Sequence, residues 1–257
     1  MSPYRWGWDA EALGLVPALS LGYLLALRRF PASRPRIAAF FAGQLLILAV
    51  FLTPVETIAL RYLLTMHLLQ NVVLAEWAPA LVVAGLSPVL AARLAGSRAM
   101  RLLTSPFAAL PIWLAVYFAW HLPWPYDTAL RHPGSILHVE HLSYLAAGCL
   151  VWWPVLQDVP RVLSPAAKAV YLFAAFVLAS PLGLLLALLP RPLYDVYEHA
   201  PERLWGLSAA TDQQLAGITM ASEQAVVFFA VFAFFFLRFL HDEEPALQLE
   251  RATATRR

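Results

Sequence analysis

The chain alternates between long apolar runs and short polar breaks that contain proline. One crossing of a bilayer core needs about 20 apolar residues, so these runs predict membrane-spanning helices. We expect seven spans, at residues 11–27, 37–54, 62–84, 107–122, 136–157, 166–189 and 213–240. Pro79 and Pro181 fall inside spans, where they should bend the helix while a neighbouring helix satisfies the freed carbonyls. The expected fold is all-α, with residues 1–240 forming one seven-helix transmembrane domain and residues 241–257 a short charged tail.

Composition supports this reading. Of the 257 residues, 61% are hydrophobic and 13% are charged, whereas a soluble domain has roughly 45–50% apolar and about 25% charged residues. A water-soluble globule and a disordered chain are therefore both excluded. Eighteen basic residues against 16 acidic ones give no support for a nucleic-acid partner. The single cysteine, Cys149, excludes an intrachain disulfide and a Cys-X-X-Cys site.

The distribution of basic residues predicts the orientation in the membrane. Most of the arginines, and Lys168, fall in the loops after spans one, three and five and beyond span seven. Cytoplasmic loops carry the excess of Lys and Arg. We therefore expect the N-terminus outside and the C-terminal tail in the cytoplasm, as an odd number of spans requires.

Six of the seven histidines fall on the outer side in this topology. Four of them lie at the outer ends of spans, namely His67, His121, His138 and His141. His138 and His141 are three residues apart and share a helix face. Imidazole is a common ligand of copper, zinc and iron, so we favour a metal or cofactor site over capping or carbonyl binding for His67, His138 and His141. His132 and His199 lie in loops and are expected to face solvent.

Two carboxylates fall near the middle of the membrane. Glu223 lies 11 residues beyond Asp212, which places it about 16 Å deeper in span seven, and Glu76 has a comparable depth in span three. A carboxylate there is costly and marks a possible functional site. A proton relay, an ion ligand and a neutral acid bonded to a carbonyl all remain open. On a regular helix Glu76 points away from His67. Cys149 is either a soft copper ligand or, more in keeping with a lone cysteine, a packing residue.

The sequence lacks the motifs of ordinary enzymes, including phosphate-binding loops, dinucleotide fingerprints and His-Glu-X-X-His. Three stretches, at 66–88, 120–157 and 211–220, instead resemble the CtaG family of cytochrome c oxidase assembly factors. They contain His67-Leu68-Leu69-Gln70 through Pro79 and Gly85-Leu86-Ser87-Pro88. They also contain His121-Leu122-Pro123, His138-Val139-Glu140-His141, Trp152-Trp153-Pro154 and Asp212-Gln213-Gln214-Leu215-Ala216-Gly217 with Met220. Asn71 stands where the family usually has a second histidine.

The resemblance implies a seven-span protein of the bacterial cytoplasmic membrane that is not an enzyme. It implies copper at the outer face, delivered to a cytochrome c oxidase subunit, with a periplasmic copper chaperone as a possible second partner. The expected ligands are His67, His138 and His141, with His121 and Met220 as further candidates. Polar residues expected around them or along a path are Asn71, Glu140, Asp212, Glu223 and Glu76, with Glu140 and Asp212 orienting imidazoles. Two alternatives stay open: a haem-binding or electron-transfer protein, and a small proton-coupled transporter that uses Glu76, Glu223 and Asp212.

Overall fold

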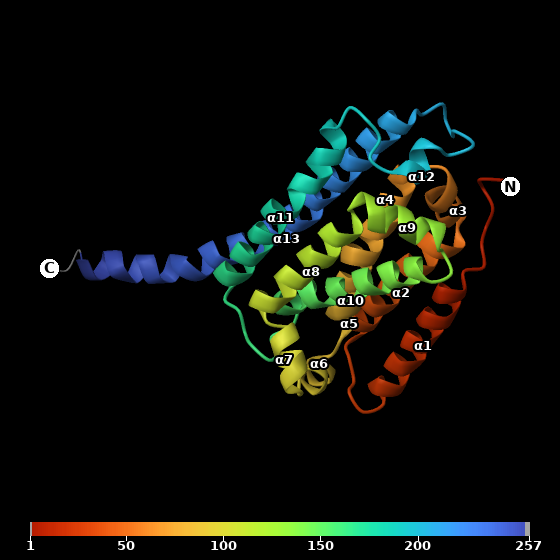
Figure 1. The fold of residues 1–257 in the computed structure, drawn as a ribbon. Helices are drawn as coiled ribbons and strands as arrows, with labels where there is room; N and C mark the ends of the chain where they lie inside the picture. Colours follow the sequence, from red (N-terminus) through yellow and green to blue (C-terminus); the bar gives the residue numbers. More distant parts are fainter. Residues whose placement is uncertain (1, 255–257) are drawn as a thin grey trace.

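The computed structural model describes residues 2–254, with side chains to residue 242, and this part of the chain is helical without a strand. Thirteen α-helices and one π-helical segment follow one another (Figure 1). The first half contains α1 Ala10–Leu27, α2 Arg34–Leu52, α3 Pro54–Arg61, α4 Leu64–Val72, η1 Val73–Trp77, α5 Ala78–Gly85, α6 Pro88–Leu94 and α7 Arg98–Leu103. The second contains α8 Pro106–Trp120, α9 Pro123–Arg131, α10 Ile136–Leu156, α11 Pro165–Leu188, α12 Asp195–Glu198 and α13 Ala209–Ala254.

Many helices begin at a proline in the first turn, as α3, α6, α8, α9 and α11 do. Proline suits this position because its missing N–H would have no partner in the helix. The prolines expected to separate the spans thus also start the helices that follow. Four short helices, α3, α6, α7 and α9, occupy stretches that the sequence reading left at a span end or in a loop.

Five helical segments are long and apolar enough to cross a membrane, namely Ala10–Leu27, Arg34–Leu52, Leu64–Gly85, Pro165–Leu188 and Ala209–Asp242. The pair α8 and α9, bent by 71°, is a sixth if it counts as one span. Within the described residues, α10 does not meet these criteria, although it occupies the predicted fifth span. Polar residues, including His138, Glu140 and His141, lower the apolar character of its outer half. The prediction of an all-helical membrane protein is confirmed, whereas seven spans and their orientation remain predictions.

The predicted third span is not one regular helix. Residues 73–77 form a π-helical turn between α4 and α5, just before Pro79. Pro79 cannot donate to the carbonyl four residues earlier, and that carbonyl, of Ala75, accepts from Trp113 Nε1 of α8 at 3.3 Å. Gly148 of α10 packs against the same turn, where a Cβ would lie 2.3 Å from the Ala75 oxygen. The expected replacement of a freed carbonyl's partner by a neighbouring helix is therefore observed.

Helices α11 and α13 pack side by side (Figure 1), and α13 also packs against α4. Small residues allow the close approach, because a Cβ at Gly217 would lie 2.6 Å from the Gly183 oxygen. Phe228 joins this pair to the bundle, since its ring stacks on Trp152 of α10 at 5.5 Å and lies 5.7 Å from Trp113. Helix α13 continues past the predicted span end at 240 to Ala254, so the expected tail is helical over most of its length.

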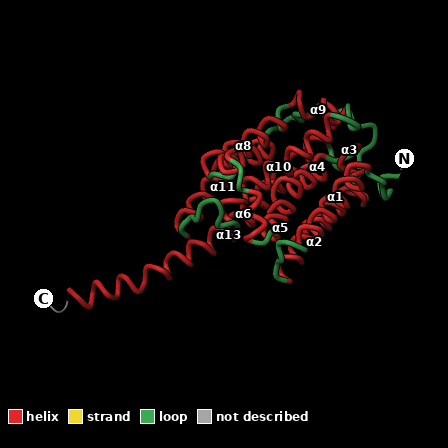
Figure 2. Tube along the Cα trace, turned by 90° about the horizontal axis from the view of Figure 1, so that it is seen from below, coloured by secondary structure: helices red, strands yellow, loops and turns green. Residues whose placement is uncertain are grey.

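The N-terminus, α3, α9 and α12 gather at one end of the molecule, and both views show α3 and α9 near the N-terminus (Figures 1 and 2). Helices α6 and α7 lie at the opposite end (Figure 1). The first end is the one that the charge distribution assigns to the outer side, and the helix ends that carry the histidines converge there.

Candidate metal centre

Glu11, His138 and His141 form the tightest cluster of potential metal ligands at this end. Glu11 Oε2 lies 2.5 Å from His138 Nδ1 and 3.3 Å from His141 Nδ1. Among the described residues, this is the one group of three or more His, Cys, Asp or Glu residues whose ligand atoms all lie within 4.8 Å of one another. The Glu11 and His141 side chains are buried, and that of His138 is 35% exposed, so the cluster opens toward solvent on the His138 side.

Two helices bring these three residues together. Glu11 lies in the first turn of α1, which begins where Asp9 Oδ1 accepts the Ala12 N–H at 2.8 Å. His138 and His141 lie one turn apart on α10 and present one face. The edge of Phe51 packs on the His141 ring, with centroids 4.9 Å apart. The two imidazoles and the carboxylate are therefore held by rigid elements.

His67 lies deeper, fully buried near the start of α4. Its Nδ1 is 2.8 Å from Tyr197 Oη, and the Tyr197 hydroxyl itself donates to the Ala59 carbonyl at 2.5 Å. The Tyr197 proton is thereby used, so His67 Nδ1–H is the donor and the lone pair of the neutral ring is on Nε2. That Nε2 atom is buried and has no hydrogen-bond partner.

His121 repeats this arrangement at the end of α8. Its Nδ1 lies 2.7 Å from the Tyr117 carbonyl, which can only accept, so Nδ1 carries the proton. The backbone of the same residue is fixed by Tyr194, whose hydroxyl donates to the His121 carbonyl at 2.9 Å. His121 Nε2 is again buried without a partner. Tyr126 lies between the two rings, 5.1 Å from His67 and 6.1 Å from His121.

The buried Nε2 atom of His141 is also unpartnered, so three imidazoles with anchored Nδ1 atoms leave three free nitrogens. A buried polar atom without a partner is uncommon and calls for an explanation. Imidazoles that bind metals use one ring nitrogen while the other is fixed by a hydrogen bond. The Nδ1 atom of His141 contacts Glu11, whereas its Nε2 remains free. The three free nitrogens do not all lie within 4.8 Å of one another.

Glu140 and Asn71 form a buried pair beside His67. Asn71 Nδ2 donates to Glu140 Oε1 at 3.1 Å, and the same oxygen lies 3.9 Å from His67 Nε2, too far for a hydrogen bond. Glu140 Oε2 and Asn71 Oδ1 have no partner. Asn71, at the position where the resemblance leads one to expect histidine, thus supports Glu140 and offers only an amide oxygen to an ion.

Asp212 lies at the start of α4 and not at an imidazole. Its carboxylate accepts from the N–H of Leu64 at 2.7 Å and of Thr65 at 3.1 Å, and from the Thr65 hydroxyl at 2.7 Å. Asp212 therefore caps the N-terminus of α4, whereas we had expected it to orient an imidazole. The N–H groups of the first helical turn need such an acceptor because they have no partner in the helix. Met220 is buried in the apolar core, about 12 Å along α13 from Asp212 and so deeper than His67.

Glu56 of α3 is an acidic neighbour that the sequence reading missed. Its Oε2 accepts from Gln70 Nε2 at 2.5 Å. Burial raises the pKa of the Glu56 carboxyl to about 8, the hydrogen bond from Gln70 lowers it, and the charges of Asp9 and Glu11 raise it further. Acidic side chains, namely those of Asp9 and Glu11, thus lie close enough to Glu56 to disfavour a further negative charge there.

Glu76 and Glu223 belong to a separate layer deeper in the bundle. Glu76 Oε1 accepts from Gln224 Nε2 at 3.1 Å, and Glu223 Oε1 accepts from Trp77 Nε1. Of the remaining candidates, Cys149 is half-buried among apolar residues, and His132 and His199 are exposed.

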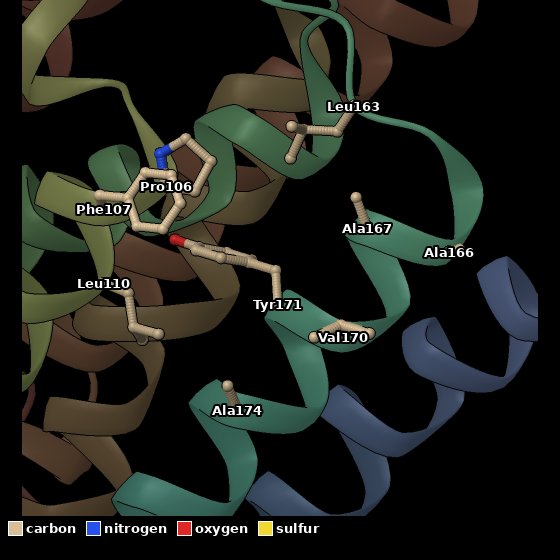
Figure 3. A pocket seen from close by; sticks show the side chains of 9 residues that line it. All are labelled: Pro106, Phe107, Leu110, Leu163, Ala166, Ala167, Val170, Tyr171 and Ala174. Atoms are coloured by element: carbon tan, nitrogen blue, oxygen red, sulfur yellow. The ribbon is translucent and has the colours of Figure 1, made fainter.

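An apolar pocket lies away from all these groups. It has a volume of about 450 Å³ and opens between the first turns of α8 and α11 (Figure 3). Its lining consists of Pro106, Phe107, Leu110, Leu163, Ala166, Ala167, Val170, Tyr171 and Ala174. The Tyr171 hydroxyl donates to the Val151 carbonyl at 3.0 Å. Such a lining suits hydrocarbon and offers no ligand to an ion.

Sequence reasoning did not select four neighbours of the candidate site, namely Glu11, Glu56, Tyr126 and Tyr197. The sequence could have indicated Glu11, because the predicted topology places it at the outer end of span one, as it places the histidines at the outer ends of theirs. Tyr197 lies in the loop between spans six and seven, and no pattern in the sequence indicates its contact with His67.

Together these features define a polytopic helical membrane protein with a histidine and carboxylate cluster at one end. The family model described as cytochrome c oxidase caa3 assembly factor (Caa3_CtaG) matches residues 21–242, so the chain belongs to that family, and the resemblance drawn from the sequence is confirmed. No curated protein and no solved structure matched the chain.

Proposed function

We propose that this chain is a non-enzymatic assembly factor that binds copper at the outer face of the bacterial cytoplasmic membrane and aids its delivery to a cytochrome c oxidase subunit. In this proposal α10 and the bent α8–α9 pair also cross the membrane, which gives seven spans, with the N-terminus outside. Membership of the oxidase assembly family supports a cytochrome c oxidase subunit as the recipient of the copper. The convergence of Glu11, His138 and His141 supports the binding of a metal ion at this place.

The donor chemistry favours a divalent ion of borderline softness. Two imidazoles and one carboxylate suit Cu(II) or Zn(II), whereas Cu(I) prefers thiolate and thioether ligands. Two sulfur candidates, Cys149 and Met220, lie in apolar packing. We therefore assign the first binding position to Glu11, His138 and His141 and take the ion as cargo in the Cu(II) state.

The deeper imidazoles extend this site. His67, His121 and His141 each keep a free Nε2. In the proposal, the outer cluster captures the ion from solvent or from a periplasmic chaperone. The free Nε2 of His67, 3.9 Å from Glu140 Oε1, offers it a deeper, fully buried ligand.

The test is complementation of a strain that lacks this chain. A Glu11→Ala, His138→Ala, His141→Ala variant should restore little oxidase activity, and the oxidase that forms should contain less copper than that from the wild-type strain. The matched control is a His132→Ala, His199→Ala variant, because these two outer histidines are exposed. Equal membrane levels must be verified by immunoblot. Full activity from the triple variant would overturn the proposal.

An absorbance spectrum of the purified protein addresses the haem alternative. Histidines on facing helices can ligate haem axially, so a Soret band in protein made with sufficient haem would support that function. Our proposal expects no such band.

A further inference from the structure

We propose that Glu76 and Glu223 form an intramembrane proton-binding site in which the two carboxyls share one proton. The site is independent of the copper proposal, since none of its side chains is among the proposed copper ligands. It is built from η1, α8 and α13, which bring together Glu76, Trp77, Tyr117, Glu223 and Gln224.

The depth of the site follows from its distance from the α4 cap. Glu76 comes 12 residues after Leu64, and Glu223 comes 11 residues after Asp212, so both lie roughly 16–18 Å along the helices from the outer end. Glu76 is fully buried, and Glu223 is 9% exposed. Two full negative charges at this depth would be strongly unfavourable.

Neutral donors hold one oxygen of each carboxyl. Gln224 Nε2 donates to Glu76 Oε1 at 3.1 Å and to Tyr117 Oη at 2.7 Å. Trp77 Nε1 donates to Glu223 Oε1. These N–H groups can stabilise a single anion, but they bring no positive charge that would offset a second one.

The second oxygen of each carboxyl lacks a hydrogen-bond partner. Glu76 Oε2 and Glu223 Oε2 are buried, and no donor reaches them; Gln224 Oε1 is also unpartnered. The two carboxyls are brought together because Gln224, next to Glu223, donates to Glu76, and Trp77, next to Glu76, donates to Glu223. Two carboxylate oxygens cannot bond to each other without a proton on one of them. One proton between Glu76 and Glu223 satisfies both orphaned oxygens at once.

The surroundings allow this state. The titratable groups that act on Glu76 are Glu223 from α13 and Tyr117 from α8. Helix α10 contributes the uncharged Gly148 against the adjacent turn. The π-helical turn places Glu76 here, since its wider winding changes the direction of residues 73–77. Such turns occur frequently at functional sites.

The experiment is infrared difference spectroscopy of the full chain in lipid nanodiscs at pH 7. It measures the C=O stretching band of protonated carboxylic acid and compares the wild type with Glu76→Gln and with Glu223→Gln. Glutamine is the neutral isostere of a protonated glutamate, so either single variant keeps one donor and one anion. Each should therefore lose the whole contribution of the pair, as much band intensity as the double variant Glu76→Gln, Glu223→Gln loses. The control Glu202→Gln, at an exposed outer position, should lose none.

Two results would overturn the proposal. If both carboxyls were protonated, each single variant would lose only half of the intensity that the double variant loses. If both were ionised, neither variant would lose intensity, and stabilisation of the wild type by sodium would then reveal a metal-cation site. The difference in band intensity between the wild type and the double variant is a further check: acidification should raise it from one carboxyl to two, and an unchanged difference would contradict a shared proton.

Discussion

The carboxylate of Glu11 lies 2.5 Å from the Nδ1 atom of His138, although 127 positions separate the two residues. This contact, extended to His141, turns a pair of histidines on one helix face into a three-residue cluster. Glu11 either joins the two Nδ1 atoms as a ligand or fixes the imidazoles from outside. Loss of such an outer partner costs about 10–100-fold in metal affinity.

We therefore expect Glu11→Gln to weaken copper binding by at least about tenfold, because the amide is a poor ligand and a weaker acceptor. Titration of the metal-free protein with Cu(II) in a competing chelator measures this change. Glu202→Gln, at an exposed outer position, is the control. Unchanged affinity in Glu11→Gln would remove Glu11 from the site.

Asp212→Ala should lower the free energy of unfolding by about 1–3 kcal/mol, because it leaves the buried N–H of Leu64 and its neighbour without an acceptor. Thermal unfolding in detergent measures the loss. Copper stoichiometry should stay near that of the wild type. A variant of normal stability that binds less copper would instead show that Asp212 acts on the imidazoles.

Gly217→Ala should destabilise the α11–α13 pair, because the new Cβ would lie 2.4 Å from the backbone nitrogen of Ala187. Overpacking of this kind costs about 1–3 kcal/mol, more than alanine gains in helix propensity. Gly14→Ala is the matched control, since a Cβ there meets nothing within 4 Å. Equal melting temperatures for the two variants would show that the helices separate easily.

Glu56 predicts a pH dependence of stability. Its folded-state pKa of about 8, raised by burial, exceeds the ordinary value of 4.5. The folded state thus holds a proton that the unfolded state releases, so the contribution is full below about pH 4.5 and is lost as the pH rises to about 8. Glu56→Gln should abolish that loss. Melting curves at pH 5 and pH 9 test this, and an equal decline in both proteins would assign the effect elsewhere.

The sequence predicted most helix positions because membrane helices must be continuously apolar, and prolines marked the breaks. Its failures have physical causes. The π-helical turn at 73–77 depends on packing of Trp113 and Gly148 against Ala75, which no local pattern records. The gathering of His67, His121, His138 and His141 followed from topology, whereas the anchoring of His67 by Tyr197 depends on how a loop folds over the bundle.

The most direct test of the copper proposal is the metal content of the purified protein. The full chain, made with added copper, would be analysed beside its His138→Ala, His141→Ala variant and a His132→Ala, His199→Ala control. We expect about one copper per chain in the wild type and the control, and a loss of most of it in the His138, His141 variant. The same copper content in all three proteins, or none in the wild type, would contradict the assignment.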